Sequence, residues 1–183
     1  MEYLILLFLF IILIFSLVVL VFTGNTLFNL IRVKVPYVAT PEWAISTIIK
    51  YLCLKKGKIV YEIGCGDARF LIRLKEKCPE IIARGYEIAW WPWWQAKMNI
   101  KKSGINVDLV KKNFYHENLS QADVVFCFLI HGVMEKVEKK LLEELKPGTI
   151  VISYGFKFPN WRPYEIISNL DKPEGSKIYI YQK

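Results

Sequence analysis

The sequence predicts a doubly wound α/β domain that follows one long apolar helix. An apolar, largely β-branched run at residues 59–63 leads into a glycine turn and then into a helix pattern. Four further apolar strand patterns alternate with helix patterns, which is typical of a mostly parallel sheet covered on both faces. Residues 3–22 form a separate, uncharged stretch at the N-terminus.

The glycine turn after the first strand is the centre of this pattern. Gly64 and Gly66 allow the backbone to turn sharply and to approach a ligand closely. The helix pattern that follows places Phe70, Leu71 and Leu74 on one face. A strand, a glycine loop and a helix in this order form the nucleotide-binding start of a doubly wound sheet.

A carboxylate stands at the end of the next expected strand, residues 81–87. This residue, Glu87, follows Gly66 by 21 positions. A spacing of roughly 20 residues is the one at which an acid meets the ribose hydroxyls of a bound nucleotide. An ionised carboxylate only accepts hydrogen bonds, so Glu87 suits two ribose donors.

The residues of the glycine loop distinguish between nucleotides. A dinucleotide loop would need glycine at position 69, where this chain has Arg69. Instead, Glu62 precedes Gly64 by two residues. This arrangement resembles motif I of the seven-strand S-adenosylmethionine methyltransferases, in which the early acid lies near the methionine part of the cofactor. The alternative is a glycine-rich turn in an unrelated α/β domain.

The apolar N-terminal stretch is long enough to cross a bilayer core of about 30 Å. A cleaved signal peptide, the alternative, usually carries a basic start and a small-residue cleavage site, whereas this chain begins with Glu2 as its one early charge. We therefore expect a single-pass anchor and link at residues 1–31 and a methyltransferase domain at residues 32–183. Arg32 and Lys34 follow the span, so the positive-inside rule places the domain on the cytoplasmic side.

The chain carries a formal net charge of +8. A basic domain is drawn to anionic lipid headgroups or to nucleic acid, and the anchor favours the first. The four cysteines have no metal-ligand spacing, so we expect no metal site.

The remaining patterns complete the expected domain. Thr40 is expected to cap a helix that begins at Pro41 and runs to about residue 54. A helix at 90–102 opens with four tryptophans, which suit either packing on the sheet or the headgroup level of a membrane. The helix expected at 131–145 turns Leu142 inward and Glu138 and Lys140 toward solvent. Further strands are expected at 107–110, 122–128 and 149–154, with a terminal hairpin at 164–170 and 177–181.

Several motifs in order resemble one methyltransferase family more closely. They are the N-terminal span, residues 36–40, the loop at 62–69, Gly85-Tyr86-Glu87 followed by Pro92-Trp93, residues 145–148 and residues 156–161. The chain resembles the membrane-anchored protein-lysine methyltransferases whose mitochondrial members modify ATP synthase subunit c and the adenine nucleotide translocase. It departs from that family at Glu62, Ala68 and Asn113, where Asp, a third Gly and an acid are frequent.

The resemblance implies S-adenosylmethionine as the cofactor and a membrane-associated protein with an acceptor lysine as the substrate. The expected cofactor-binding residues are Tyr37, Thr40, Glu62, Gly64, Gly66, Asp67, Glu87, Ile88, Asn113, Phe114 and Phe128. The expected acceptor site consists of Tyr154, Phe158 and Trp161, for which core packing is the alternative role. Two other functions remain open: a methyltransferase for a membrane lipid or quinone, and a non-enzymatic membrane adaptor.

Overall fold

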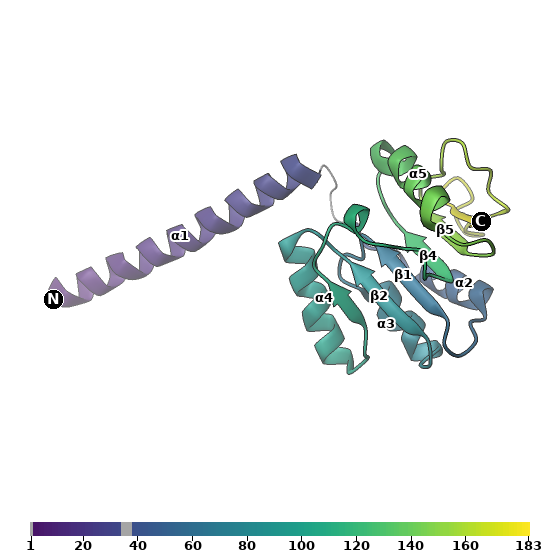
Figure 1. The fold of residues 1–183 in the computed structure, drawn as a ribbon. Coiled ribbons are helices and arrows are strands. Elements are labelled where there is room, and N and C mark those ends of the chain that lie inside the picture. Colours follow the sequence, from purple (N-terminus) through teal and green to yellow (C-terminus); the bar gives the residue numbers. More distant parts are fainter. Residues whose placement is uncertain (1, 34–37) are drawn as a thin grey trace. The chain divides into compact units, whose positions relative to one another are not determined.

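The computed structural model describes residues 2–33 and 38–183, together with the side chains of residues 3–26 and 38–183 (Figure 1). The chain separates into two compact units, Met1–Pro36 and Tyr37–Lys183.

The first unit is one helix, α1, which runs from Glu2 to Val33. Its segment Tyr3–Thr26 is long and apolar enough to cross a membrane, and none of it is buried within the structure. The Thr23 hydroxyl donates to the Val19 carbonyl and the Thr26 hydroxyl to the Phe22 carbonyl, so these polar groups are satisfied inside the helix. A helix of this kind serves either as a membrane anchor or as a signal sequence.

The second unit is built on a sheet of seven strands in the order β3-β2-β1-β4-β5-β7-β6. The first five of these pair in parallel, β7 is antiparallel to β5, and β6 is antiparallel to β7. The strands are β1 (Ile59–Ile63), β2 (Ile82–Tyr86), β3 (Asp108–Val110), β4 (Val124–Cys127), β5 (Ile150–Tyr154), β6 (Glu165–Ile167) and β7 (Ile178–Gln182). The expected α/β fold, with five parallel strands and a terminal hairpin, is confirmed.

Helices cover both faces of this sheet and enclose two apolar clusters. On one face α2 (Glu42–Leu52), α3 (Arg69–Lys77) and α4 (Trp90–Ser103) pack on side chains such as Val60, Phe126 and Ile152. On the other face α5 (Met134–Glu144), preceded by the 3-10 turns η1 (Phe114–His116) and η2 (His131–Val133), packs on side chains such as Val125 and Val151. Neighbouring positions of β4 and β5 therefore serve opposite layers, as the two-residue period of a strand requires.

The start of α2 differs from the expectation. The residue that caps the helix is Pro41, whose carbonyl accepts from the amides of Ala44 and Ile45 at 3.0 and 3.1 Å, and no side chain caps it. The prediction that Thr40 caps this helix is therefore wrong. Thr40 is buried instead, next to the helix start.

Three side chains of α5 also lie otherwise than the helix pattern predicts. Glu138 and Lys140, expected in solvent, are 3% and 9% exposed, whereas Leu142, expected inside, is 37% exposed. Glu138 accepts from the backbone amide of Asn160 at 3.1 Å and so supports the loop after β5. Lys140 donates to the carbonyls of Tyr115 and Glu117 at 3.2 and 2.9 Å and pairs with Glu144. These charged side chains are buried because they find partners in loops that are distant in the sequence. Helical periodicity contains no information on such partners.

The amino ends of the central strands are joined by Asp123. Its carboxylate accepts from the Ile59 amide at 2.8 Å and from the ammonium groups of Lys58 and Lys146 at 3.1 and 3.2 Å. Partial burial raises the pKa of Asp123, but these hydrogen bonds outweigh it and hold the pKa below the ordinary value of 3.8. The carboxylate thus stabilises the fold above its unfolded pKa, and that contribution is lost as the pH falls through its folded pKa.

The substitution Asp123→Asn should therefore lower the free energy of unfolding by about 1 kcal/mol at pH 7, since the charge on two ion pairs is removed. Urea unfolding of the full chain in detergent at pH 7 and pH 3 measures this. The deficit should shrink at pH 3, where the native carboxylate begins to protonate as well. An equal deficit at both pH values would contradict the assignment.

Candidate active site

The sheet changes direction between β1 and β4, and the glycine loop lies at this point. β1 pairs with β2 on one side and with β4 on the other, so a crevice opens beyond the carboxyl ends of β1 and β4. We call the edge at which the parallel strands end the carboxyl edge. The loop is held there by the amides of Gly64 and Cys65, which both donate to the Tyr86 carbonyl at 2.9 Å.

Gly64 is required for two reasons. Its φ is +74°, in the left-handed region that favours glycine. A Cβ added at this position would also lie 2.8 Å from Cδ2 of Leu129. Any side chain at position 64 would therefore strain the backbone and displace the side chain of Leu129, which belongs to the loop after β4.

Glu87 connects the glycine loop to the next helix. Its Oε2 accepts from the Gly66 amide at 3.0 Å, and its Oε1 accepts from the Ala89 amide at 2.8 Å. Burial raises the pKa of Glu87, while the amides of Ala89, Gly66 and Ile88 act in the opposite direction. Each carboxylate oxygen keeps a second lone pair, so the expected contact with ribose hydroxyls stays compatible with these bonds.

Glu62 is the most unusual polar group of the site. It is 4% exposed, and within the described part of the chain its Oε2 has no hydrogen-bond partner. Burial raises its pKa well above the ordinary value of 4.5, and the nearby charges of Asp67 and Glu87 raise it further. A backbone hydrogen bond at Leu71 acts in the opposite direction on the pKa. A buried carboxyl oxygen without a partner is costly, and such groups concentrate at binding sites. A cationic group of a ligand would satisfy it.

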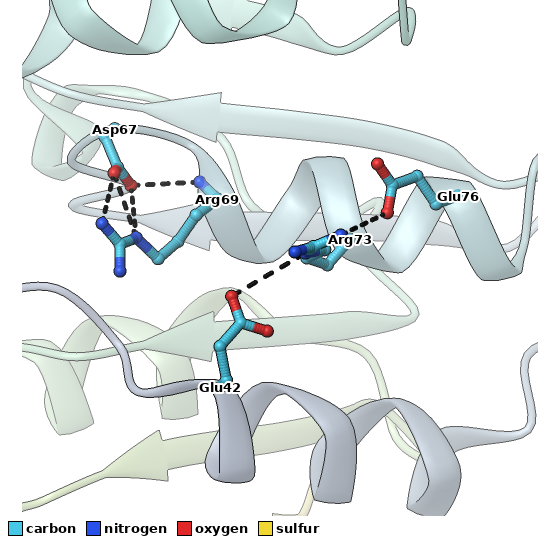
Figure 2. A network of polar contacts seen from close by, with 5 residues as sticks. All are labelled: Glu42, Asp67, Arg69, Arg73 and Glu76. Atoms are coloured by element: carbon cyan, nitrogen blue, oxygen red, sulfur yellow. Dashed lines mark hydrogen bonds and ion pairs between the residues drawn. The ribbon is translucent and has the colours of Figure 1, made fainter. Parts of the chain in front are cut away.

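Asp67 is engaged with its own loop, as Figure 2 shows. Its carboxylate accepts from the Arg69 guanidinium, with the shortest contact 2.8 Å, and from the Arg69 amide at 3.1 Å. These bonds secure the start of α3. Further along α3, Arg73 lies 3.8 Å from Glu42 at the start of α2 and 3.2 Å from Glu76. The expected contact of Asp67 with the cofactor stays a prediction.

The aromatic residues expected at the site fall into two groups on opposite layers. Phe128 packs edge-on against Tyr154 with ring centroids 4.8 Å apart, and Trp43 of α2 packs against the same tyrosine at 5.8 Å. These three side chains lie at or after the carboxyl ends of β4 and β5 and at the start of α2, close to the glycine loop in the topology of the sheet. Sequence reasoning did not place Trp43 at the site, although its position at the beginning of α2 puts it at the carboxyl edge.

The second aromatic group lies on the layer of α5. Phe158 is 1% exposed and packs against Tyr181 at 4.8 Å, and its amide donates to the Tyr181 hydroxyl at 2.9 Å. Trp161 stacks on Phe158 at 5.8 Å. The structure therefore gives Phe158 a packing role in the loop that Glu138 supports, and an acceptor-binding role for Phe158 and Trp161 stays a prediction.

Other expected site residues surround the crevice less tightly. Ile88 is 39% exposed after Glu87, and Phe114 contacts Tyr115 in η1. Asn113 accepts from the Tyr115 amide at 3.1 Å through Oδ1, so its carboxamide nitrogen is left for any contact with adenine. Tyr37 lies outside the described residues.

The described residues contain no group of three or more His, Cys, Asp and Glu side chains arranged to hold a metal ion. His131 lies at the start of η2 with its ring near Phe156, at 6.2 Å. The groups that the structure gathers at the site are carboxylates, backbone amides and aromatic rings.

Comparison with known proteins identifies the family. Residues 62–165 match the ANTKMT methyltransferase domain. A protein-lysine N-methyltransferase of Saccharolobus islandicus is 37% identical over 149 residues, which cover 80% of this chain and 92% of that protein. This chain belongs to the ANTKMT methyltransferase family. The resemblance seen in the sequence is thereby confirmed.

Two other comparisons agree with this placement. The adenine nucleotide translocase lysine N-methyltransferase of Mus musculus is 28% identical over 139 residues, and the match spans 60% of that protein. The crystal structure of an RNA methyltransferase from Salinibacter ruber in complex with S-adenosyl-L-homocysteine superposes with a TM-score of 0.72 at 26% identity, covering 79% of this chain and 93% of that one. The chain is thus an S-adenosylmethionine-dependent methyltransferase, and the predicted fold class and cofactor are confirmed.

The residues of the crevice fit this cofactor. S-adenosylmethionine is cationic at its amino group and at its sulfonium, and the buried Glu62 has one carboxyl oxygen, Oε2, without a partner among the described residues. Its ribose offers two hydroxyl donors, and Glu87 keeps acceptor capacity beside the glycine loop. We therefore expect Glu62 to bind the methionine part of the cofactor and Glu87 to bind its ribose. The backbone amides of the glycine loop are expected to lie against the cofactor.

The substitution Glu62→Gln should change the free energy of unfolding and the affinity for S-adenosylmethionine in opposite directions. A raised folded pKa means that the protonated acid stabilises the fold, and this contribution is lost as the pH rises through the folded pKa. Glutamine imitates the protonated acid, so the variant should be more stable than the wild type at pH 8, with a smaller difference at pH 5. Cofactor affinity should fall by about tenfold or more, because a charged hydrogen bond is lost. Urea unfolding and calorimetry of the full chain in detergent measure both, and a variant with lower stability at pH 8 and unchanged affinity would contradict this account.

For Glu87 the comparison of two variants is informative. Glu87→Ala should weaken S-adenosylmethionine binding by about 1–3 kcal/mol, because the ribose and the Gly66 amide both lose their acceptor. Glu87→Gln keeps one acceptor oxygen and should lose less. Titration calorimetry tests the order, and equal affinity of the wild type and the alanine variant would refute the ribose role of Glu87.

Proposed function

We propose that this protein transfers the methyl group of S-adenosylmethionine to a lysine of a membrane-associated protein. The proposal is carried by the 37% identity with a protein-lysine N-methyltransferase across 92% of its length. We take the long apolar helix at the start of the same chain as a single-pass anchor that leaves the domain on the cytoplasmic side. Such an anchor supports the proposal that the substrate is a membrane-associated protein.

The cofactor, when bound, supplies an electrophilic methyl group on sulfur. The task of the protein is to hold this group and the acceptor amine in line and to keep water away. Gly64 and Gly66 bring the backbone close to the cofactor, and Glu87 fixes the loop by accepting a hydrogen bond from the Gly66 amide. Glu62 supplies the negative charge in the buried part of the crevice.

The acceptor lysine must be neutral to attack. The rings of Phe128, Tyr154 and Trp43 form an apolar wall at the carboxyl edge, and burial against such a wall lowers the pKa of an amine. The departing proton then passes to solvent without a dedicated base. The same aromatic faces favour the cationic methylated product through cation–π contact. Tyr154, which is 6% exposed, is the centre of this wall.

Two other acceptor classes, RNA and a membrane lipid or quinone, each have an observation in their favour. The superposed structure from Salinibacter ruber is named an RNA methyltransferase, and this chain has a net charge of +8. The anchor equally suits a lipid or quinone acceptor. The experiment must therefore separate protein, RNA and lipid products.

The full chain, reconstituted in lipid nanodiscs, should be incubated with methyl-labelled S-adenosylmethionine and host membranes, and separately with total RNA. We expect label in a protein band and, after hydrolysis, in methylated lysine. The variant Tyr154→Ala should lose most of this activity while it retains cofactor binding, and Tyr154→Phe, which keeps the ring, should retain most of it. Label in the lipid extract or in RNA, with none in protein, would overturn the proposed acceptor, and no label in any fraction would contradict the proposed transfer to a membrane-associated protein.

A further inference from the structure

The outer face of α4 carries tryptophans and lysines, and the methyltransferase reaction has no role for them. The exposed residues of this helix are Trp90, Trp91, Trp94, Lys97, Lys101, Lys102 and Ser103. The three indoles are 42%, 38% and 40% exposed, so a large part of each ring faces outward, which favours the second of the two roles that the sequence left open. We call the six tryptophan and lysine residues the tryptophan–lysine face.

The indoles of this face form one contiguous group. The rings of Trp91 and Trp94 are stacked, with centroids 5.2 Å apart and planes 18° from parallel. The ring of Trp90 lies 6.2 Å from that of Trp91. Three large aromatic rings that share one exposed face are a feature of interaction sites, because a solvent-exposed face usually carries such rings singly.

The charge of the face has one sign. The fourteen residues of α4 include three lysines and no acid. One further lysine adds to the positive charge near the helix, because the ammonium group of Lys111 lies 5.3 Å from the ring centre of Trp93, beside that of Lys97 at 5.4 Å. The face therefore complements a negatively charged surface.

The spacing of these residues suits a flat partner. Trp90, Trp94, Lys97 and Lys101 follow one another at intervals of four, three and four residues and thus lie along a single stripe of the helix. Indoles prefer the headgroup level of a bilayer, where the ring is partly desolvated and its N–H stays near water, and lysines bind anionic headgroups. A flat stripe with both groups matches a bilayer surface.

The tryptophan–lysine face lies at the same edge of the domain as the candidate active site. α4 begins three residues after Glu87, so its tryptophans stand at the carboxyl edge, beside the crevice. α2 begins at this same edge, with Pro41 as its cap. Binding of this face to a bilayer would bring the opening of the crevice to the membrane surface.

We infer that the tryptophan–lysine face binds the surface of a bilayer that contains anionic lipid, and that it orients the carboxyl edge toward acceptors at that surface. The orientation of the crevice rests on the proposed function, whereas the lipid contact itself does not. The two are therefore tested by separate measurements.

The contact is tested with the full chain in nanodiscs that contain anionic lipid brominated near the headgroup. Three of the six tryptophans belong to the face, so the lipid should quench roughly half of the indole emission. A variant with Trp90, Trp91 and Trp94 replaced by phenylalanine should lose most of this quenching. The matched control Trp161→Phe, in the loop after β5, should keep it. Replacement of Lys97, Lys101 and Lys102 by glutamine, or added salt, should reduce it.

Equal quenching of the wild type and the triple-phenylalanine variant would overturn the inference. So would an emission change that follows protein concentration or added RNA instead of lipid, since it would assign the face to a second copy or to nucleic acid. Cofactor affinity of the variants of the tryptophan–lysine face should match the wild type, which shows that they are folded. If the labelling experiment fails while the quenching persists, the proposed acceptor is wrong and the lipid contact stands.

Discussion

The carboxylate of Glu87 is the contact on which the active site depends. It comes from the end of β2, yet it holds the amide of Gly66 in the loop after β1 and the amide of Ala89 at the start of α4. Two strands and a helix are thereby fixed relative to one another at the carboxyl edge. Because the loop has Gly64 and Gly66 at positive φ, it has little rigidity of its own, and an external acceptor defines its shape.

Around this contact the chain places more acidic side chains than the fold alone requires. Glu62 and Glu87 are both buried, and the carboxylate of Asp67 lies close enough to raise the pKa of Glu62. Asp67 has Arg69 as its partner and Glu87 has backbone amides, whereas one oxygen of Glu62 has none in the described part of the chain. A native structure that retains such a group gives up stability for function. We propose that pairing with the cation of the cofactor compensates for this cost.

Sequence reasoning succeeded where a pattern reports local chemistry. The spacing from Gly66 to Glu87 located the acid because consecutive parallel strands bring their ends together. The prediction that Glu138 and Lys140 face solvent was wrong, because helical periodicity assigns charged residues to solvent and contains no information on distant partners such as the Asn160 amide. It also grouped Tyr154 with Phe158, which the alternation of β5 and the turn after it send to opposite layers. Trp43 was missed because its packing against Tyr154 joins elements more than one hundred residues apart.

The central claim is that Glu62 becomes the partner of the cationic cofactor, and proton release on binding tests it most directly. Burial favours the protonated acid in the free protein, and a bound cation favours its ionised form. The heat of S-adenosylmethionine binding to the full chain at about pH 6, measured in two buffers with different heats of ionisation, reports the number of protons released. The account predicts net release in the wild type and its disappearance in Glu62→Gln. Binding without proton release, or with the same release in both proteins, would contradict it.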